Sequence, residues 1–179
     1  YEVAEGKVAE FTGSVEVIEK ARRYLARASA LNDLQVRQLK AILYAAARNP
    51  QTKPGLVTAR IKADAAQTEA LFGFDFKIHG KSVSTNEIDR ILEEENDEQV
   101  RLAAWTASKE VGKGLKKGLA NLVSLRNKTV QALGYKDFFQ YQVSDYGMTV
   151  PEMMELMRRF ARELRPLYRE LHTWARYRL

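Results

Sequence analysis

The chain has no cysteine, only four prolines and only ten glycines among its 179 residues. The absence of cysteine excludes a disulfide framework and thiol chemistry, but it leaves the cellular compartment open. No apolar run approaches the roughly 18 residues that a membrane span requires, so no membrane partner is expected. Glycine and proline interrupt helices, so their scarcity favours an α-helical protein. The length of 179 residues is that of one domain of ordinary size.

Histidine is scarce too, since the only two, His79 and His172, lie far apart in the sequence. With no cysteine to complete a ligand set, they predict no zinc site, and His79 is expected in a turn. Neither histidine lies near a serine flanked by glycines, the arrangement that would favour nucleophilic catalysis. The sequence therefore identifies no catalytic, cofactor-binding or metal-binding residue in this chain.

Positive charge exceeds negative charge, with a formal net charge of +6. An excess of this kind can indicate a nucleic-acid partner, but specific binding usually requires a concentrated basic stripe. Here the basic residues are scattered over the predicted helices, and the one dense run of charge, at residues 93–98, is acidic. We therefore expect a solvated surface and no nucleic-acid partner.

Apolar residues at intervals of three and four positions predict helices along most of the chain. The predicted fold class is all-α, a multi-helix bundle of antiparallel helical hairpins in which the first three helices form successive hairpins. Residues 74–83 alternate apolar and polar side chains around His79-Gly80, which predicts at most one short β-ribbon. The predicted helices cover residues 14–30, 32–49, 56–72, 84–95, 97–111, 115–133 and 150–179.

Polar residues and glycines at the ends of these segments predict how the helices begin and end. The run from Gly112 to Gly118 contains lysines but does not match the phosphate-binding pattern G-x-x-x-x-G-K-[ST], so we attribute its glycines to close helix packing or a break between helices. The predicted N-terminal caps are Ser14, Asn32 or Asp33, Ser84, Asn96 or Asp97, and Thr149; the predicted C-terminal caps are Gly73, in the left-handed conformation, and Gly134.

The last predicted helix carries one continuous apolar stripe, which is typical of a helix that packs against a partner. Pro166 lies inside this pattern and should kink the helix, because proline removes a backbone hydrogen bond. No stop signal closes the pattern before Leu179, so we expect the chain to end in mid-helix. The stripe consists of Met153, Met157, Phe160, Leu164, Leu167, Leu171 and Trp174.

Several short motifs towards the end of the chain carry a family resemblance. They are Leu125-Arg126-Asn127, Leu133-Gly134-Tyr135-Lys136-Asp137-Phe138, Leu164-Arg165-Pro166-Leu167-Tyr168, and Leu171-His172 with Arg176; Trp105 after two alanines fits as well. Over roughly residues 84–179 the chain resembles the N-terminal half of the angiotensin-converting enzyme family (peptidase family M2), and its bacterial members in particular. Related helical zinc peptidases of the thimet oligopeptidase type share the second motif. The resemblance therefore extends to the superfamily that contains both types of peptidase.

This resemblance implies an all-α fold with a deep cleft between two helical halves, in a zinc peptidyl-dipeptidase that cleaves short peptides. The family's zinc motif His-Glu-x-x-His does not occur in residues 1–179. The resemblance therefore implies one helical domain, 1–179, that forms the lid and cleft wall of a larger enzyme, with sub-units at 1–73 and 84–179. Its expected partner is the C-terminal catalytic half that carries the zinc, and the family favours an extracytoplasmic location.

Two positions correspond to residues through which family members often bind chloride. Lys109 lies where the family has an arginine, and lysine lacks the planar fork of that side chain. Tyr146 precedes the final helix, across a one-residue gap in the alignment. Aromatic residues cluster nearby, as core packing or as a cleft wall, at Tyr135, Phe138, Phe139, Tyr141 and Tyr146. A different hypothesis is a stand-alone helical interaction module without enzymatic activity.

Overall fold

The computed structural model describes residues 2–178, which are helical apart from turns and one antiparallel two-stranded ribbon. This confirms the prediction of an all-α fold with one short ribbon near residues 74–83. The elements are α1 (Glu2–Thr12), α2 (Val15–Leu25), a 3-10 turn (Ala28–Ala30), α3 (Asp33–Ala47), α4 (Pro54–Phe72), β1 (Phe76–Ile78), β2 (Lys81–Val83), α5 (Thr85–Glu94), α6 (Glu98–Lys109), α7 (Val111–Gln131), α8 (Phe138–Asp145) and α9 (Val150–Arg178).

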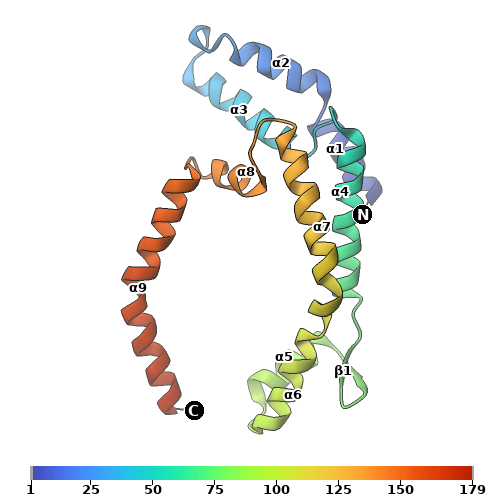
Figure 1. Ribbon diagram of the computed structural model, residues 1–179, viewed down its shortest axis with the longest axis vertical. Coiled ribbons are helices and arrows are strands. Elements are labelled where there is room, and N and C mark those ends of the chain that lie inside the picture. Colours follow the sequence, from blue (N-terminus) through green and yellow to red (C-terminus); the bar gives the residue numbers. More distant parts are fainter. Residues whose placement is uncertain (1, 179) are drawn as a thin grey trace.

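The long helices α4 and α7 form the central pair and run antiparallel along most of the molecule (Figure 1). At one end α1 packs against α4, and α2 and α3 form a hairpin above it. At the other end lie α5, α6 and the ribbon. From α8 the chain continues into α9, which forms a separate arm. No helix within residues 2–178 is both long enough and apolar enough to cross a bilayer.

The hydrophobic core is divided into small clusters instead of one large core. The cluster at the ribbon end joins α5, α6 and the start of α7, and the other two join α1 to α4 and α3 to α7 and α8. Each cluster fastens neighbouring elements to the α4–α7 pair, so this pair is the frame of the fold. Their buried members are Phe76, Ile88, Ala104 and Val111; Ala9, Val57 and Ile61; and Ala47, Val130 and Tyr141.

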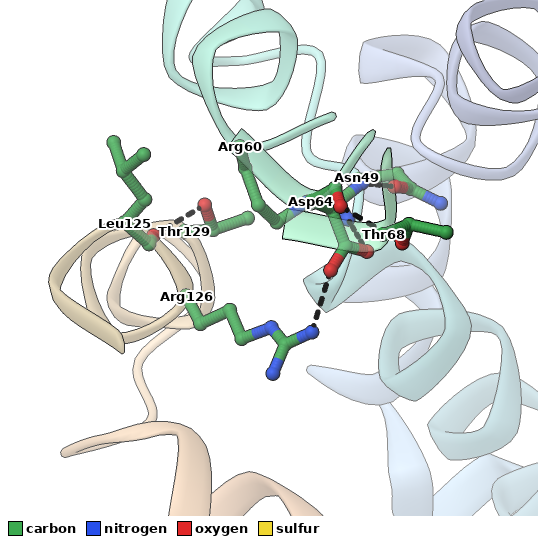
Figure 2. A network of polar contacts seen from close by, with 7 residues as sticks. All are labelled: Asn49, Arg60, Asp64, Thr68, Leu125, Arg126 and Thr129. Carbon is green, nitrogen blue, oxygen red and sulfur yellow. Dashed lines mark hydrogen bonds and ion pairs between the residues drawn. The ribbon is translucent and has the colours of Figure 1, made fainter. Parts of the chain in front are cut away.

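A polar network also crosses the frame and is drawn in Figure 2. Arg60 on α4 is only 3% exposed, and its Nη2 donates a 2.8 Å hydrogen bond to Asn49 Oδ1. Asn49 Nδ2 in turn donates to Thr12 Oγ1 at 3.0 Å. On the other side, Arg126 Nη2 from α7 lies 2.8 Å from Asp64 Oδ1, and Arg60 Nη1 lies 4.0 Å from Asp64 Oδ2. Thus α1, α4, α7 and the segment after α3 are joined through one carboxylate and two guanidinium groups.

Burial lowers the pKa of the Arg60 guanidinium, and the nearby Arg48 adds to that effect. Arginine nevertheless stays protonated in proteins, so a positive charge is held inside the fold. The Nε of Arg60 has no hydrogen-bond partner among the described residues. Asp64 is therefore the closest opposite charge that compensates Arg60.

Two glycines permit close approaches around this frame. A Cβ on Gly13 would lie 1.6 Å from the carbonyl oxygen of Asn49, so the turn between α1 and α2 requires glycine. In the glycine run, a Cβ on Gly118 would lie 1.9 Å from the side chain of Gln67 on α4. The run also begins directly after the break between α6 and α7 at Glu110. Close packing therefore applies to Gly118, whereas Gly112 and Gly114 have no such neighbour and lie just after the helix break.

Most of the predicted caps are confirmed. Asn32 forms a reciprocal capping box with Gln35. Asp97 and Ser84 each accept backbone N–H bonds at the starts of α6 and α5. Gly134 follows α7 with a φ of 100°, in the region that favours glycine.

Three local predictions are wrong, and two helices were missed. Ser14 precedes α2 but makes no capping bond through its side chain. Gly73 has a φ of −87° instead of a left-handed value, because the chain leads on into β1 without reversing. The helix predicted over residues 14–30 ends at Leu25 and tightens into a 3-10 turn. Helices α1 and α8 were not predicted, because the glycine at position 6 and the weakly periodic apolar residues obscure α1, and α8 has only eight residues.

The predicted series of successive hairpins is confirmed only for α2 and α3. Helix α4 packs mainly against α7, which follows it by several elements. Helix periodicity identifies an apolar face but does not identify its partner, and here the pairing is long-range. This long-range α4–α7 pair sets the distance between the two ends of the molecule.

We predict that Asp64→Ala lowers the free energy of unfolding by about 2–4 kcal/mol, because it leaves the buried Arg60 without its carboxylate. Urea denaturation followed by circular dichroism measures this loss. The matched control is Glu163→Ala, which breaks the exposed 2.8 Å pair with Arg159 on α9. It should cost less than about 1 kcal/mol, as exposed pairs do. Equal losses for the two variants would contradict the role given to Asp64.

Candidate functional site

A long exposed apolar surface lies along α9. This helix contacts α8 near its start and then runs as an arm that is separate from the α4–α7 pair (Figure 1). None of its residues is buried. In its last four turns the stripe predicted from the sequence faces solvent: Leu164, Leu167, Leu171 and Trp174 are 57–64% exposed. A contiguous apolar surface of this kind is typical of an interaction site.

The arm is stabilised by contacts within its own helix. Thr149 and Glu152 cap its start, with the Thr149 N–H and Oγ1 each 2.7 Å from Glu152 Oε2. These hydrogen bonds lower the pKa of Glu152 and confirm the predicted cap. Further along, ion pairs such as Arg159 with Glu163 join successive turns. The helix continues through Pro166, and Figure 1 shows gradual curvature over its whole length. The arm therefore keeps its form while its apolar stripe stays uncovered.

A second feature is a groove of about 920 Å³ between the α2–α3 hairpin and the α8–α9 corner. We call it the basic groove, because Arg22, Arg37 and Lys40 line it and the only carboxylate in its lining is Asp145. Its apolar and aromatic lining comes mainly from Leu43, Tyr44, Leu133, Tyr135, Met148 and Val150. The elements that line the groove, α2 and α3 on one side and α8 and the start of α9 on the other, lie at the upper end of the molecule in Figure 1.

Stacked aromatic rings hold the two sides of the basic groove together. Tyr44 on α3 lies against Tyr141 on α8, with ring centroids 4.4 Å apart and planes 12° apart. Tyr135 meets Tyr141 edge-on at 5.3 Å. Burial raises the pKa of the Tyr141 phenol, so this ring stays neutral. Of the predicted aromatic cluster, Tyr135, Phe138 and Tyr141 pack in the core, whereas Phe139 and Tyr146 are exposed.

The two residues predicted to bind anions are not brought together. Lys109 ends α6, and its Nζ lies over the Trp105 ring, 5.5 Å from the centroid. Tyr146 follows α8 and is 69% exposed, and α8 lies at the end of the α4–α7 pair opposite to α6 (Figure 1). The two residues could belong only to separate sites, and anion binding at each of them stays a prediction.

The described residues do not fit a zinc site. Residues 2–178 contain no group of three or more histidine, cysteine, aspartate or glutamate side chains that could hold a metal ion. His79 lies in the turn between β1 and β2, as predicted, with a φ of 50°. His172 lies on α9 beside Tyr168, with ring centroids 5.8 Å apart. The two histidines belong to different parts of the fold.

Comparison with known protein families decides the identity. The family model described as angiotensin-converting enzyme (Peptidase_M2) matches residues 3–179. The chain belongs to this family. The match extends the resemblance from residues 84–179 to nearly the whole chain and decides between this family and the thimet oligopeptidase type. The angiotensin-converting enzyme family is a family of zinc peptidases, and the all-α fold of this member agrees with that relation. No solved structure matches the chain.

Sequence reasoning missed the basic groove. Its cations belong to two helices, and the scattered basic residues of the sequence were expected only on a solvated surface. Arg37 and Lys40, however, are three positions apart on α3, which places them on one face of that helix. Tyr44 continues the same face one turn later. This cationic face was visible in the sequence, but the opposite wall from α8 and α9 was not.

We predict that replacing Leu164, Leu167 and Leu171 together by glutamine changes the free energy of unfolding by less than about 1 kcal/mol, because these side chains are already in water. The same variant should bind markedly less of the apolar dye ANS. The control is Ile18→Ala, which empties a fully buried position and should cost about 2–5 kcal/mol. A large loss of stability in the α9 variant would show that the stripe is covered within the chain.

Proposed function

We propose that this chain is the non-catalytic N-terminal helical part of a zinc-dependent peptidyl-dipeptidase that cleaves short peptides. The observation that carries this proposal is the family match over residues 3–179, in a chain whose described residues offer no zinc ligands. Membership of a zinc peptidase family implies a metal site, and residues 2–178 do not contain the side chains to build one. Its partner in the proposal is therefore a C-terminal catalytic half.

The α9 stripe supports this partnership. Burying one leucine or similar side chain contributes about 1.5–3 kcal/mol, so covering the stripe would stabilise a complex substantially before the costs of association. In the first half of α9, ion pairs such as Arg162 with Glu155 already join charged side chains of the polar face. In the proposal the catalytic half covers the apolar face, and α9 becomes one wall of the cleft.

The α2–α3 end of the molecule is suited to act as a lid over a cleft. Residues 1–73 include the α2–α3 hairpin, which projects beyond the α4–α7 frame (Figure 1). Residues 84–179 supply the frame's second helix and the α9 arm. We propose that the first sub-unit limits access to the cleft, so that only short unfolded peptides enter. The chloride positions Lys109 and Tyr146 would then each need groups from the catalytic half.

The alternative is a helical interaction module that keeps this architecture without any catalytic half. In this alternative the α9 stripe is also a binding surface, but its partner is a separate protein. The source reading frame beyond the codon for Leu179 distinguishes the two. A His-Glu-x-x-His motif with a later glutamate would support the peptidase, and a stop within a few codons would support the module.

We predict that this chain alone does not hydrolyse a blocked tripeptide with zinc supplied, and that mixing it with the C-terminal half restores cleavage. The variant in which Leu164, Leu167 and Leu171 become glutamine should raise the concentration needed for half-maximal activity by more than about tenfold, because docking loses apolar area. The control is Lys116→Gln with Lys117→Gln, two exposed positions on α7. Full activity of the C-terminal half without this chain would contradict the proposal.

A matching test addresses the lid. In the complete enzyme, replacement of the α2–α3 hairpin by a short linker, which keeps the α4–α7 frame, should allow cleavage of larger peptides while short peptides are still cleaved. Unchanged rejection of large substrates would count against a lid in this segment.

A further inference from the structure

The basic groove has more positive charge than its own lining neutralises. Arg22, Arg37 and Lys40 line it together with the single carboxylate of Asp145. None of the three cations takes part in the ion pairs formed among residues 2–178. Some other arginines of the chain, such as Arg90 and Arg159, do have carboxylate partners. The cations of the groove are therefore available to a ligand.

The geometry places these charges along one wall of the groove. Arg37 and Lys40 share a face of α3, and Arg22 comes from the antiparallel α2. The opposite wall is formed by the turn after α7 and by the start of α9, where Leu133, Met148 and Val150 supply apolar surface. A ligand lying in the groove would thus meet cations on one side and apolar side chains on the other.

The volume is suited to a short ligand. About 920 Å³ lies within the range of pockets that bury molecules the size of a drug or a few amino acids. Arginine binds carboxylates through two parallel hydrogen bonds, and lysine adds a further positive charge. Tyr44 and Tyr135 can pack against apolar side chains of the ligand.

An acidic peptide fits these walls better than a nucleic acid does. Asp145 repels carboxylates and phosphates alike, but it can accept hydrogen bonds from the backbone N–H groups of a peptide, and a phosphate backbone offers no such donors. Tight nucleic-acid binding also requires many phosphate contacts along a basic surface, and here only three cations line the groove.

We propose that the basic groove binds short peptides that carry two or more carboxylates. Arg37 and Lys40 hold the carboxylates, and Arg22 contributes at the α2 edge. The apolar wall receives the side chains between them. Binding needs no group outside residues 2–178, so it is independent of the proposed peptidase role and of the catalytic half.

The test uses this chain and a fluorescein-labelled peptide, Glu-Leu-Glu-Leu-Glu, followed by fluorescence anisotropy. The expected result is saturable binding that weakens by at least about tenfold when every glutamate of the peptide becomes glutamine, since the charge-assisted hydrogen bonds are lost. Equal binding of the two peptides would overturn the proposal, as would no binding of either.

Variants separate the groove from the general positive charge of the chain. Arg37→Gln with Lys40→Gln should weaken binding of the acidic peptide by at least about tenfold. The control Lys116→Gln with Lys117→Gln removes an equal number of positive charges, but on α7 outside the groove. It should change binding by less than about twofold. Asp145→Asn should tighten it, because a repulsive charge is removed. Circular dichroism establishes that each variant is folded.

Two results would overturn the assignment of the site. Equal weakening by the two double variants would show that only net charge attracts the peptide. A ten-residue oligothymidylate that binds more tightly than the peptide, and loses this binding in the Arg37→Gln and Lys40→Gln variant, would assign the groove to nucleic acid instead.

Discussion

The fold depends on the charge buried between α4 and α7. Arg60 is held inside the protein by Asn49 and Asp64, and Asp64 is shared with Arg126 across the helix pair. Hydrophobic contacts alone would let two long helices slide or rotate, because apolar surfaces are tolerant of small shifts. Hydrogen bonds to a buried guanidinium are directional and costly to leave unmade. The network therefore fixes the register of α4 against α7, and with it the positions of every element attached to them.

The same network joins the frame to the upper end of the molecule. Asn49 follows α3, receives the guanidinium of Arg60, and reaches Thr12 at the end of α1. The glycine at position 13 lets the α1–α2 turn lie directly on the Asn49 carbonyl. The α2–α3 hairpin is in this way held at a fixed angle to α4. The basic groove lies between this hairpin and the α8–α9 corner, so its width follows from contacts around Asn49 and from the stacking of Tyr44 on Tyr141.

Local features could be predicted from the sequence, whereas long-range pairings could not. Caps such as Asn32 and Asp97 depend on residues three positions away, and the ribbon depends on its own turn at His79-Gly80; all of these were predicted correctly. The pairing of α4 with α7 depends on residues far apart in the sequence, as in the contact of Asp64 with Arg126. Nothing in the sequence distinguishes Arg60 from the exposed arginines, because burial is a property of the assembled fold. The family resemblance was carried by motifs from Trp105 onwards, and the family match then covered the earlier residues as well.

The body of the molecule and the α9 arm differ in how far their apolar side chains are buried. The buried arginine has its carboxylate, and several charges in the first half of α9 form ion pairs, yet the apolar stripe in the second half of α9 is exposed within residues 2–178. Such an exposed stripe is typical of a surface that binds a partner. The body of the molecule, by contrast, encloses its small clusters around α4 and α7. The frame therefore buries its own apolar clusters, whereas the arm leaves its stripe exposed, and this difference is the physical basis of the proposal that a partner covers α9.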